Sequence, residues 1–88
     1  MNYRVPDHVD ARWVHDEVVI FDGRTNTYLG LNGSGAVVWS CLGGGGSVAD
    51  AVAGLTACFE VTPEVARADA TALLGELLRR GLLTPVAP

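Results

Sequence analysis

The chain has 88 residues, 49% of them hydrophobic, which is enough for one small domain with a hydrophobic core. Its formal net charge is -4, and its six basic residues, all arginines, are scattered along the sequence. Binding to a nucleic-acid backbone needs clustered positive charge, so the composition argues against it. No apolar run has the length of a membrane helix, and the start does not resemble a signal peptide. We therefore expect a soluble, cytoplasmic protein.

Two strands are predicted near the start of the chain. Residues 8–14 alternate, which places Val9, Ala11 and Trp13 on one face of the first strand. Residues 17–22 are predicted to form a second strand that is apolar on both faces. Such a pattern indicates a central strand that is covered on more than one side.

A third strand is predicted after the sequence DGRTNT, whose Asp, Gly and Asn residues are typical of tight turns. It covers residues 27–31, with Leu29 and Leu31 on one face and Tyr28 and Gly30 on the other. Three strands joined by short turns predict an antiparallel meander, in which the second strand is central and the third lies at an edge.

A first helix is expected over residues 33–42, with Asn32 as its N-terminal cap. Four glycines, residues 43–46, then interrupt the chain. They are interpreted as a flexible connector, because the Lys-Ser/Thr pair of a phosphate-binding loop is absent.

Two further helices carry clear start signals. Ser47 and Asp50 have the spacing of a capping box, and the helix that follows has an apolar face made by Val48, Val52, Leu55 and Phe59. Thr62 followed by a proline begins the third helix, which can run to Arg80 and end at Gly81.

The third helix has a wide apolar arc, formed by Ala66, Ala70, Leu73, Leu74, Leu77 and Leu78. Asp69, Glu76 and Arg80 lie along one border of this arc, beside Leu73. A helix of this kind can bury one side in the core and offer a mixed apolar and polar border to a partner. The alternative is that the arc contacts two helices of the same domain.

Few side chains in the chain are suited to catalysis. Cys41 and Cys58 form no C-x-x-C motif and are expected as buried small hydrophobic residues, with a redox or disulfide role as the alternative. His8 and His15 are expected to be solvated at strand ends, and acids such as Asp22 to face solvent in turns. The serines have no evident base. The sequence indicates no catalytic, metal or cofactor site.

The order of these motifs resembles the PqqD-like family of peptide chaperones, also called RiPP recognition elements, which bind the leader segment of ribosomally made precursor peptides. The first half of the likeness rests on Phe21-Asp22, Gly23, Tyr28, Leu31-Asn32, Trp39 and Leu42. The second half rests on Asp69, Leu73-Leu74, Leu77 and Gly81-Leu82-Leu83. DGRTNT stands where PqqD itself typically has a Pro-Glu, which favours the free-standing leader-binding proteins of lasso-peptide clusters.

The resemblance implies an α+β, winged-helix-like fold in which a three-stranded antiparallel sheet precedes three helices. Residues 1–88 would form a single domain, with residues 84–88 as a flexible tail. In this family the leader pairs with the third strand and lies against the third helix. The peptide-binding residues implied here are Tyr28, Leu29, Gly30, Leu31, Asp69, Leu73 and Glu76. For Leu29 and Leu31 a pure core role is an open alternative.

The function implied by the resemblance is that of a non-catalytic adaptor. It would capture the leader peptide and present it to a separate transglutaminase-like leader protease and a separate asparagine-synthetase-like cyclase. One alternative is a PqqD-type chaperone for a radical-SAM peptide-modifying enzyme. Two others are a winged-helix DNA-binding protein and a small enzyme.

Overall fold

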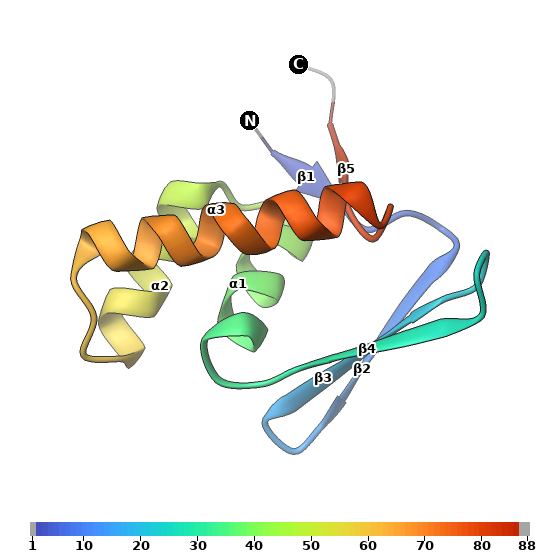
Figure 1. Cartoon of the computed structure of the whole chain (residues 1–88), viewed down its shortest axis with the longest axis horizontal. Coiled ribbons are helices and arrows are strands. Elements are labelled where there is room, and N and C mark those ends of the chain that lie inside the picture. The colour runs from blue at the N-terminus through green and yellow to red at the C-terminus, as the bar shows by residue number, and fades with distance from the viewer. Residues whose placement is uncertain (1, 87–88) are drawn as a thin grey trace.

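The computed structural model describes residues 2–86 and contains a sheet with a group of helices on one side of it (Figure 1). In chain order the elements are β1 (Tyr3–Arg4), β2 (Val9–Val14), β3 (Glu17–Asp22), β4 (Thr27–Leu31), α1 (Gly33–Gly43), α2 (Val48–Cys58), α3 (Pro63–Arg79) and β5 (Thr84–Pro85). The expected α+β architecture, a three-stranded antiparallel sheet followed by three helices, is confirmed. No helix within residues 2–86 is both long and apolar enough to cross a membrane.

The main sheet has the order β2-β3-β4, so β3 is central, as predicted. Tight turns join the strands, and His15 and Asn26 adopt the left-handed conformation there, with φ of 59° and 57°. Val18 and Ile20 on β3 are buried against the helices. Val19 and Phe21 are only half-buried, because no helix lies on the outer face (Figure 1). The prediction that β3 is covered on both sides was wrong.

The helices begin at the predicted caps. The Ser47 and Asp50 side chains form a complete capping box on α2, and the Thr62 hydroxyl accepts a hydrogen bond from the Val65 amide on α3. Asn32 occupies the N-cap position of α1, but its side chain makes no capping hydrogen bond.

The core lies among α1, α2 and α3 and continues past α1 to the inner face of the sheet. Its largest fully buried side chains are Val18, Ile20, Val38, Leu42, Leu55, Leu77, Leu82 and Leu83. The α3 arc is buried through Ala66, Ala70, Leu74 and Leu77, whereas Leu73 is half-buried and Leu78 is exposed. Phe59 was predicted to lie on the apolar core face of α2, and this was wrong. Phe59 is the C-cap residue of α2, and its extended backbone directs the side chain into an exposed position.

A second, two-stranded sheet brings the two ends of the chain together. Strand β1 pairs antiparallel with β5, with Tyr3 opposite Pro85 and Arg4 opposite Thr84. The Val86 amide adds a hydrogen bond to the Asn2 carbonyl oxygen at 2.9 Å. Residues 84–86, expected as part of a flexible tail, therefore pair with the N-terminal segment; residues 87 and 88 lie outside the described part of the chain.

Candidate functional site: a free edge of the sheet

Strand β4 pairs with β3 on one side only, so its other side is a free edge of the sheet. The register shows which of its backbone groups are free. The Gly23 amide donates to the His8 carbonyl oxygen at 2.7 Å, so this pair, which extends the β2–β3 ladder, is a hydrogen-bonded one. In an antiparallel ladder hydrogen-bonded and non-hydrogen-bonded pairs alternate. Even-numbered residues of β2 therefore bond to odd-numbered residues of β3.

The same alternation carries over to β4. The even-numbered residues of β3 direct their backbone groups away from β2, and they pair with odd-numbered residues of β4, as in Ile20 opposite Leu29. The amide and carbonyl groups of Tyr28 and Gly30 consequently point outward from the sheet edge. These are the groups with which an added strand would pair.

Tyr28 and Gly30 also lie on the open outer face of the sheet. The Tyr28 side chain is 68% exposed, and its ring packs against that of Phe21 with 4.8 Å between centroids. A Cβ atom at Gly30 would lie 2.9 Å from a carboxylate oxygen of Glu17, so this glycine makes room for the Glu17 side chain. A hollow of about 420 Å³ follows this face, lined by Asp10, Arg12, Val14, Val19, Phe21 and Tyr28.

Leu29 and Leu31 have the opposite orientation. Both are half-buried and pack against the core cluster, and a Cβ atom placed on Gly35 in α1 would lie 3.4 Å from the Leu31 Cδ2 atom. They join β4 to α1, so the structure favours the core interpretation that the sequence left open for both residues.

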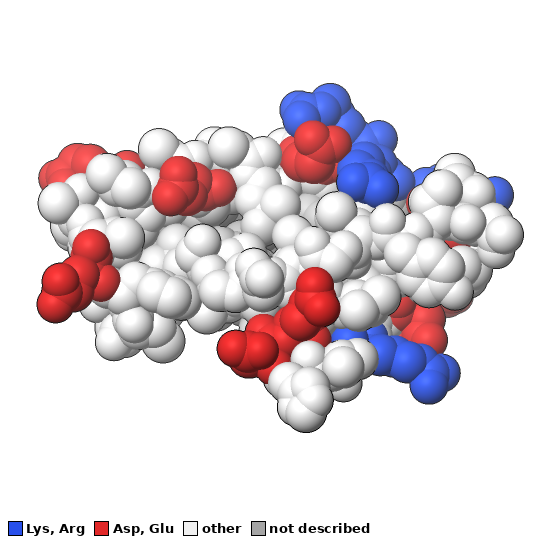
Figure 2. Space-filling view, turned by 60° about the horizontal axis from the view of Figure 1, so that its bottom comes forward, with Lys and Arg blue, Asp and Glu red and all other residues white. Residues whose placement is uncertain are grey.

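The predicted helical half of the site is on the exposed side of α3. Leu73 is half-buried against the core, whereas Asp69 and Glu76 are exposed, and Glu76 accepts a hydrogen bond from Arg79 at 3.4 Å. Helix α1 lies between α3 and β4 (Figure 1). Figure 2 shows a band of uncharged side chains, with acidic and basic side chains along its upper border and a second acidic group below its centre.

Two polar contacts hold the end of the sheet to the C-terminal end of α3. His8 Nε2 lies 2.9 Å from the Gly81 carbonyl oxygen, to which it can only donate, and the Arg24 guanidinium donates to the Arg80 carbonyl oxygen at 3.4 Å. Gly81 has a φ of 69°, and a side chain at this position would meet the Arg24 guanidinium. These contacts fix the spacing of β4 and α3 at one end of the site.

Asp22 completes this cluster from within the sheet. It is 4% exposed, and its side chain accepts a hydrogen bond from the Arg24 amide at 2.9 Å. That hydrogen bond, more than the nearby Arg24 and His8 charges, holds the pKa of Asp22 below its ordinary value of 3.8. The expectations of a solvated His8 and a solvent-facing Asp22 were both wrong: His8 binds the Gly81 backbone in a distant segment, and Asp22 is buried and binds the Arg24 amide in its own turn.

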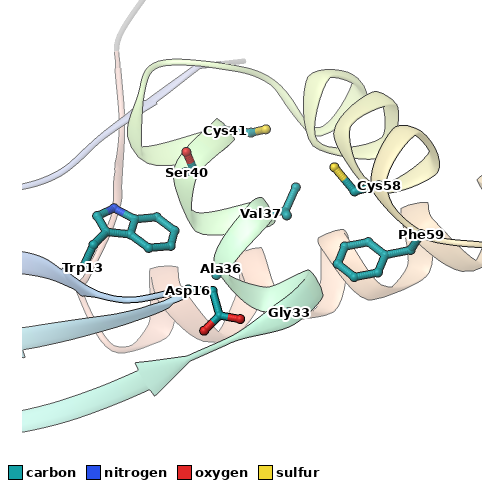
Figure 3. A pocket seen from close by; sticks show the side chains of 9 residues that line it. All are labelled: Trp13, Asp16, Gly33, Ala36, Val37, Ser40, Cys41, Cys58 and Phe59. Carbon is teal, nitrogen blue, oxygen red and sulfur yellow. The ribbon is translucent and has the colours of Figure 1, made fainter.

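A separate cavity of about 470 Å³ opens between the β2–β3 turn, α1 and the end of α2 (Figure 3). Its lining consists of Trp13, Asp16, Gly33, Ala36, Val37, Ser40, Cys41, Cys58 and Phe59. Both cysteines are free thiols; Cys41 is half-buried and Cys58 is exposed, so the expectation of a buried Cys58 was wrong. Among residues 2–86 no three His, Cys, Asp or Glu side chains are grouped as metal ligands.

A three-stranded antiparallel meander followed by three packed helices defines a winged-helix-like domain. The model of the family described as coenzyme PQQ synthesis protein D (PqqD) matches residues 17–83. This range includes β3, β4 and all three helices, and the chain belongs to that family.

Two solved structures are similar over nearly the whole chain. One is described as TbiB1 in complex with the TbiA(beta) leader peptide; it is 29% identical, with a TM-score of 0.86, and the match covers 97% of this chain and 99% of that one. The other is described as lasso peptide synthetase B1 complexed with the leader peptide, with the same identity and TM-score and 100% of its chain covered. Comparison with curated protein sequences finds no match.

Proposed function

We propose that this protein is a leader-binding adaptor of lasso-peptide biosynthesis, and that the leader binds by adding a strand to β4. The observation that carries the proposal is the likeness, over 97% of the chain, to two B1 proteins that are described as leader-peptide complexes. The free edge of β4 supports the same conclusion, because strand addition requires unpaired backbone groups of this kind.

The backbone of Tyr28 and Gly30 supplies the pairing, and neighbouring side chains supply the selection. The exposed Tyr28 ring offers an apolar surface on the outer face. On the other side of the added strand, Leu73 offers an apolar contact, with Asp69 and Glu76 at its border. A disordered leader loses conformational entropy when it binds, so several apolar anchors are needed for tight binding.

The exposed face of α3 carries carboxylates at Glu64, Asp69 and Glu76, and one of its basic residues, Arg79, is paired with Glu76. A DNA-binding winged helix would present a basic surface at this position. The charge on α3 therefore favours a peptide, and a leader with a Lys or Arg near its anchors would be complementary to these acids.

The proposal includes a non-catalytic role in the cytoplasm. The bound leader would be presented to separate enzymes, a transglutaminase-like leader protease and an asparagine-synthetase-like cyclase. The exposed β4 edge leaves a bound peptide accessible along its outer side, which suits presentation better than enclosure.

Titration with the leader peptide encoded beside the gene tests the proposal. We expect a dissociation constant in the micromolar range or tighter, measured by calorimetry or fluorescence anisotropy, with a scrambled leader of equal composition as the control. Amide resonances of Tyr28 and Gly30 should be among those that shift most in the NMR spectrum. Failure of the leader to bind a correctly folded protein would contradict the proposed function.

A further inference from the structure

The sheet has a second free edge, strand β2. It pairs only with β3 through an unbroken register from Val9 opposite Asp22 to Val14 opposite Glu17. Proteins often block such edges with proline, a bulge or charged side chains; residues 9–14 contain no proline or bulge, and their two charged side chains, Asp10 and Arg12, have opposite signs. This edge is therefore open to pairing with another strand.

The alternation that defines the free groups of β4 also defines those of β2. Because the even-numbered residues bond to β3, the odd-numbered residues Val9, Ala11 and Trp13 direct their amide and carbonyl groups outward. The Val9 amide is already used, since it donates to the Pro6 carbonyl oxygen at 3.1 Å. The outward amides of Ala11 and Trp13 and the outward carbonyls of all three residues remain.

We propose that β2 pairs antiparallel with β2 of a second copy, around a two-fold axis that passes through Ala11. A two-fold axis must match outward groups with outward groups, which is possible when it is centred on a residue of the strand but not between two residues. Centring on Ala11 or Arg12 gives the longest overlap, and centring on Arg12 is excluded because it would place two arginines opposite each other. Each Ala11 then exchanges two hydrogen bonds with Ala11 of the partner subunit, and the Trp13 amide donates to the carbonyl of Val9 of the partner subunit.

The side chains of β2 are complementary in this register. Asp10 faces Arg12 of the partner subunit in a non-hydrogen-bonded pair, where opposite side chains are closest. Within one strand Asp10 and Arg12 already form an ion pair at 3.1 Å, so two copies place four alternating charges together on the outer face. An axis centred on Val9 or Trp13 does not bring these charges opposite each other, and an axis centred on Asp10 or Arg12 places like charges opposite each other.

The inner face of β2 contributes an apolar contact. Trp13 is 52% exposed, and its ring is directed toward α1 at the edge of the cavity in Figure 3. In the proposed pairing it lies opposite Val9 of the partner subunit, which covers part of this exposed ring. The resulting dimer has one six-stranded sheet with a β4 strand at each outer end, so both leader-binding edges stay free. The dimer does not depend on the proposed function.

Charge exchange on β2 tests the dimer by sedimentation equilibrium between about 10 µM and about 1 mM protein, the range for a small interface. Asp10→Arg alone and Arg12→Asp alone each place two like-charged pairs opposite each other, and we expect the dimer dissociation constant to rise about tenfold or more. The double variant restores opposite charges and should dimerise like the wild type. A monomeric wild type, or singles that dimerise normally, would overturn the proposal.

A cysteine at the two-fold axis tests the register. With Cys41 and Cys58 replaced by serine, Ala11→Cys should form a disulfide-linked dimer on mild oxidation, because the paired Cα atoms are about 5.5 Å apart in such a pair. Arg12→Cys in the same background is the matched control and should remain uncrosslinked. Preferential crosslinking through residue 12, or loss of the dimer when leader is added, would overturn the proposed pairing through β2.

Discussion

The two edges of the sheet present the same backbone chemistry and differ in their surroundings. The free groups of β4 lie at Tyr28 and Gly30, at the edge of the sheet from which the chain continues into α1. Those of β2 lie at Ala11 and Trp13, beside side chains whose charges complement a second copy of the same strand. The free amide and carbonyl groups allow another strand to pair at each edge, and the side chains determine which strand pairs there.

The largest expected effect is the loss of leader binding when the outward amide of Gly30 is removed. Gly30→Pro deletes this donor and leaves the β3–β4 ladder intact, since proline is tolerated on an edge strand where the amide faces solvent. We expect leader affinity to fall about 100-fold, because a buried carbonyl of the leader would lose its partner and meet the proline ring. Calorimetric titration measures this loss.

Two control variants test whether the loss of leader binding is specific to the β4 amide. Gly30→Ala adds a Cβ atom next to the flexible end of Glu17 but keeps the amide, so its affinity should change by about threefold at most. Ala11→Pro removes an outward amide from β2, and it should weaken the proposed dimer while leader binding is retained. If Ala11→Pro weakened leader binding as much as Gly30→Pro does, β4 would not be the specific site.

A smaller loss of leader affinity is expected from a charge on the apolar part of α3. Leu73→Asp places a carboxylate at the predicted contact and should cost about 2 kcal/mol of binding free energy, or roughly 30-fold in affinity. Ala72→Asp adds the same charge at the neighbouring exposed residue and is the matched control. Equal affinities for the two variants would mean that the leader does not contact Leu73.

Local patterns were enough to predict the three strands of the main sheet, the helix starts at Ser47 and Thr62, and the free edge at β4. Each of these depends on residues close together in the sequence. Contacts between distant segments were missed, such as His8 with Gly81 and the pairing of β1 with β5, because a lone histidine or a two-residue strand has no periodic signal. The expectation that α3 forms part of the binding site came from the family resemblance. The spacing of its apolar residues left open whether they contact a partner or two helices of the same domain.

A smaller effect is expected from a change at Gly81, where His8 and Arg24 join the end of the sheet to the end of α3. Gly81→Ala should lower the free energy of unfolding by about 1–2 kcal/mol, because alanine is disfavoured at positive φ and its side chain would displace the Arg24 guanidinium. Chemical denaturation measures this change. Leader affinity should fall a few-fold and dimerisation through β2 should not change, since Gly81 adjoins only the end of the β4 site.

Gly75→Ala is the control for Gly81→Ala. Gly75 is inside α3, and a Cβ atom there would make an ordinary contact with the Arg79 side chain at 3.4 Å. Alanine is the better helix former, so we expect the free energy of unfolding to rise by about 0.5–1 kcal/mol. A loss of stability in both variants would mean that the effect at Gly81 does not arise from its backbone conformation.

The smallest expected effect is a change in how strongly acid destabilises the fold when Asp22 is replaced. Asp22 on β3 is paired with Val9 of β2 and with Thr27 of β4, so it lies at the end of the sheet where both edge strands are paired. Its pKa is lowered in the folded state, so its ionised form stabilises the fold above pH 3.8, and this contribution is lost as the pH falls through the folded-state pKa. Asp22→Asn should therefore reduce the decline in stability between about pH 5 and pH 2.5, measured by denaturation at each pH.

The control for Asp22→Asn is Asp7→Asn, which removes one negative charge from an exposed side chain. Only the Asp22 variant should reduce the pH dependence of the free energy of unfolding, because only Asp22 has a carboxylate that accepts a hydrogen bond from the Arg24 amide.

Acid should affect both edges of the sheet alike. In the wild type, leader binding and dimerisation should weaken over the same acidic range. If acid weakened one edge and left the other intact, Asp22 would not support the two edges jointly, and their shared dependence on this end of the sheet would be refuted.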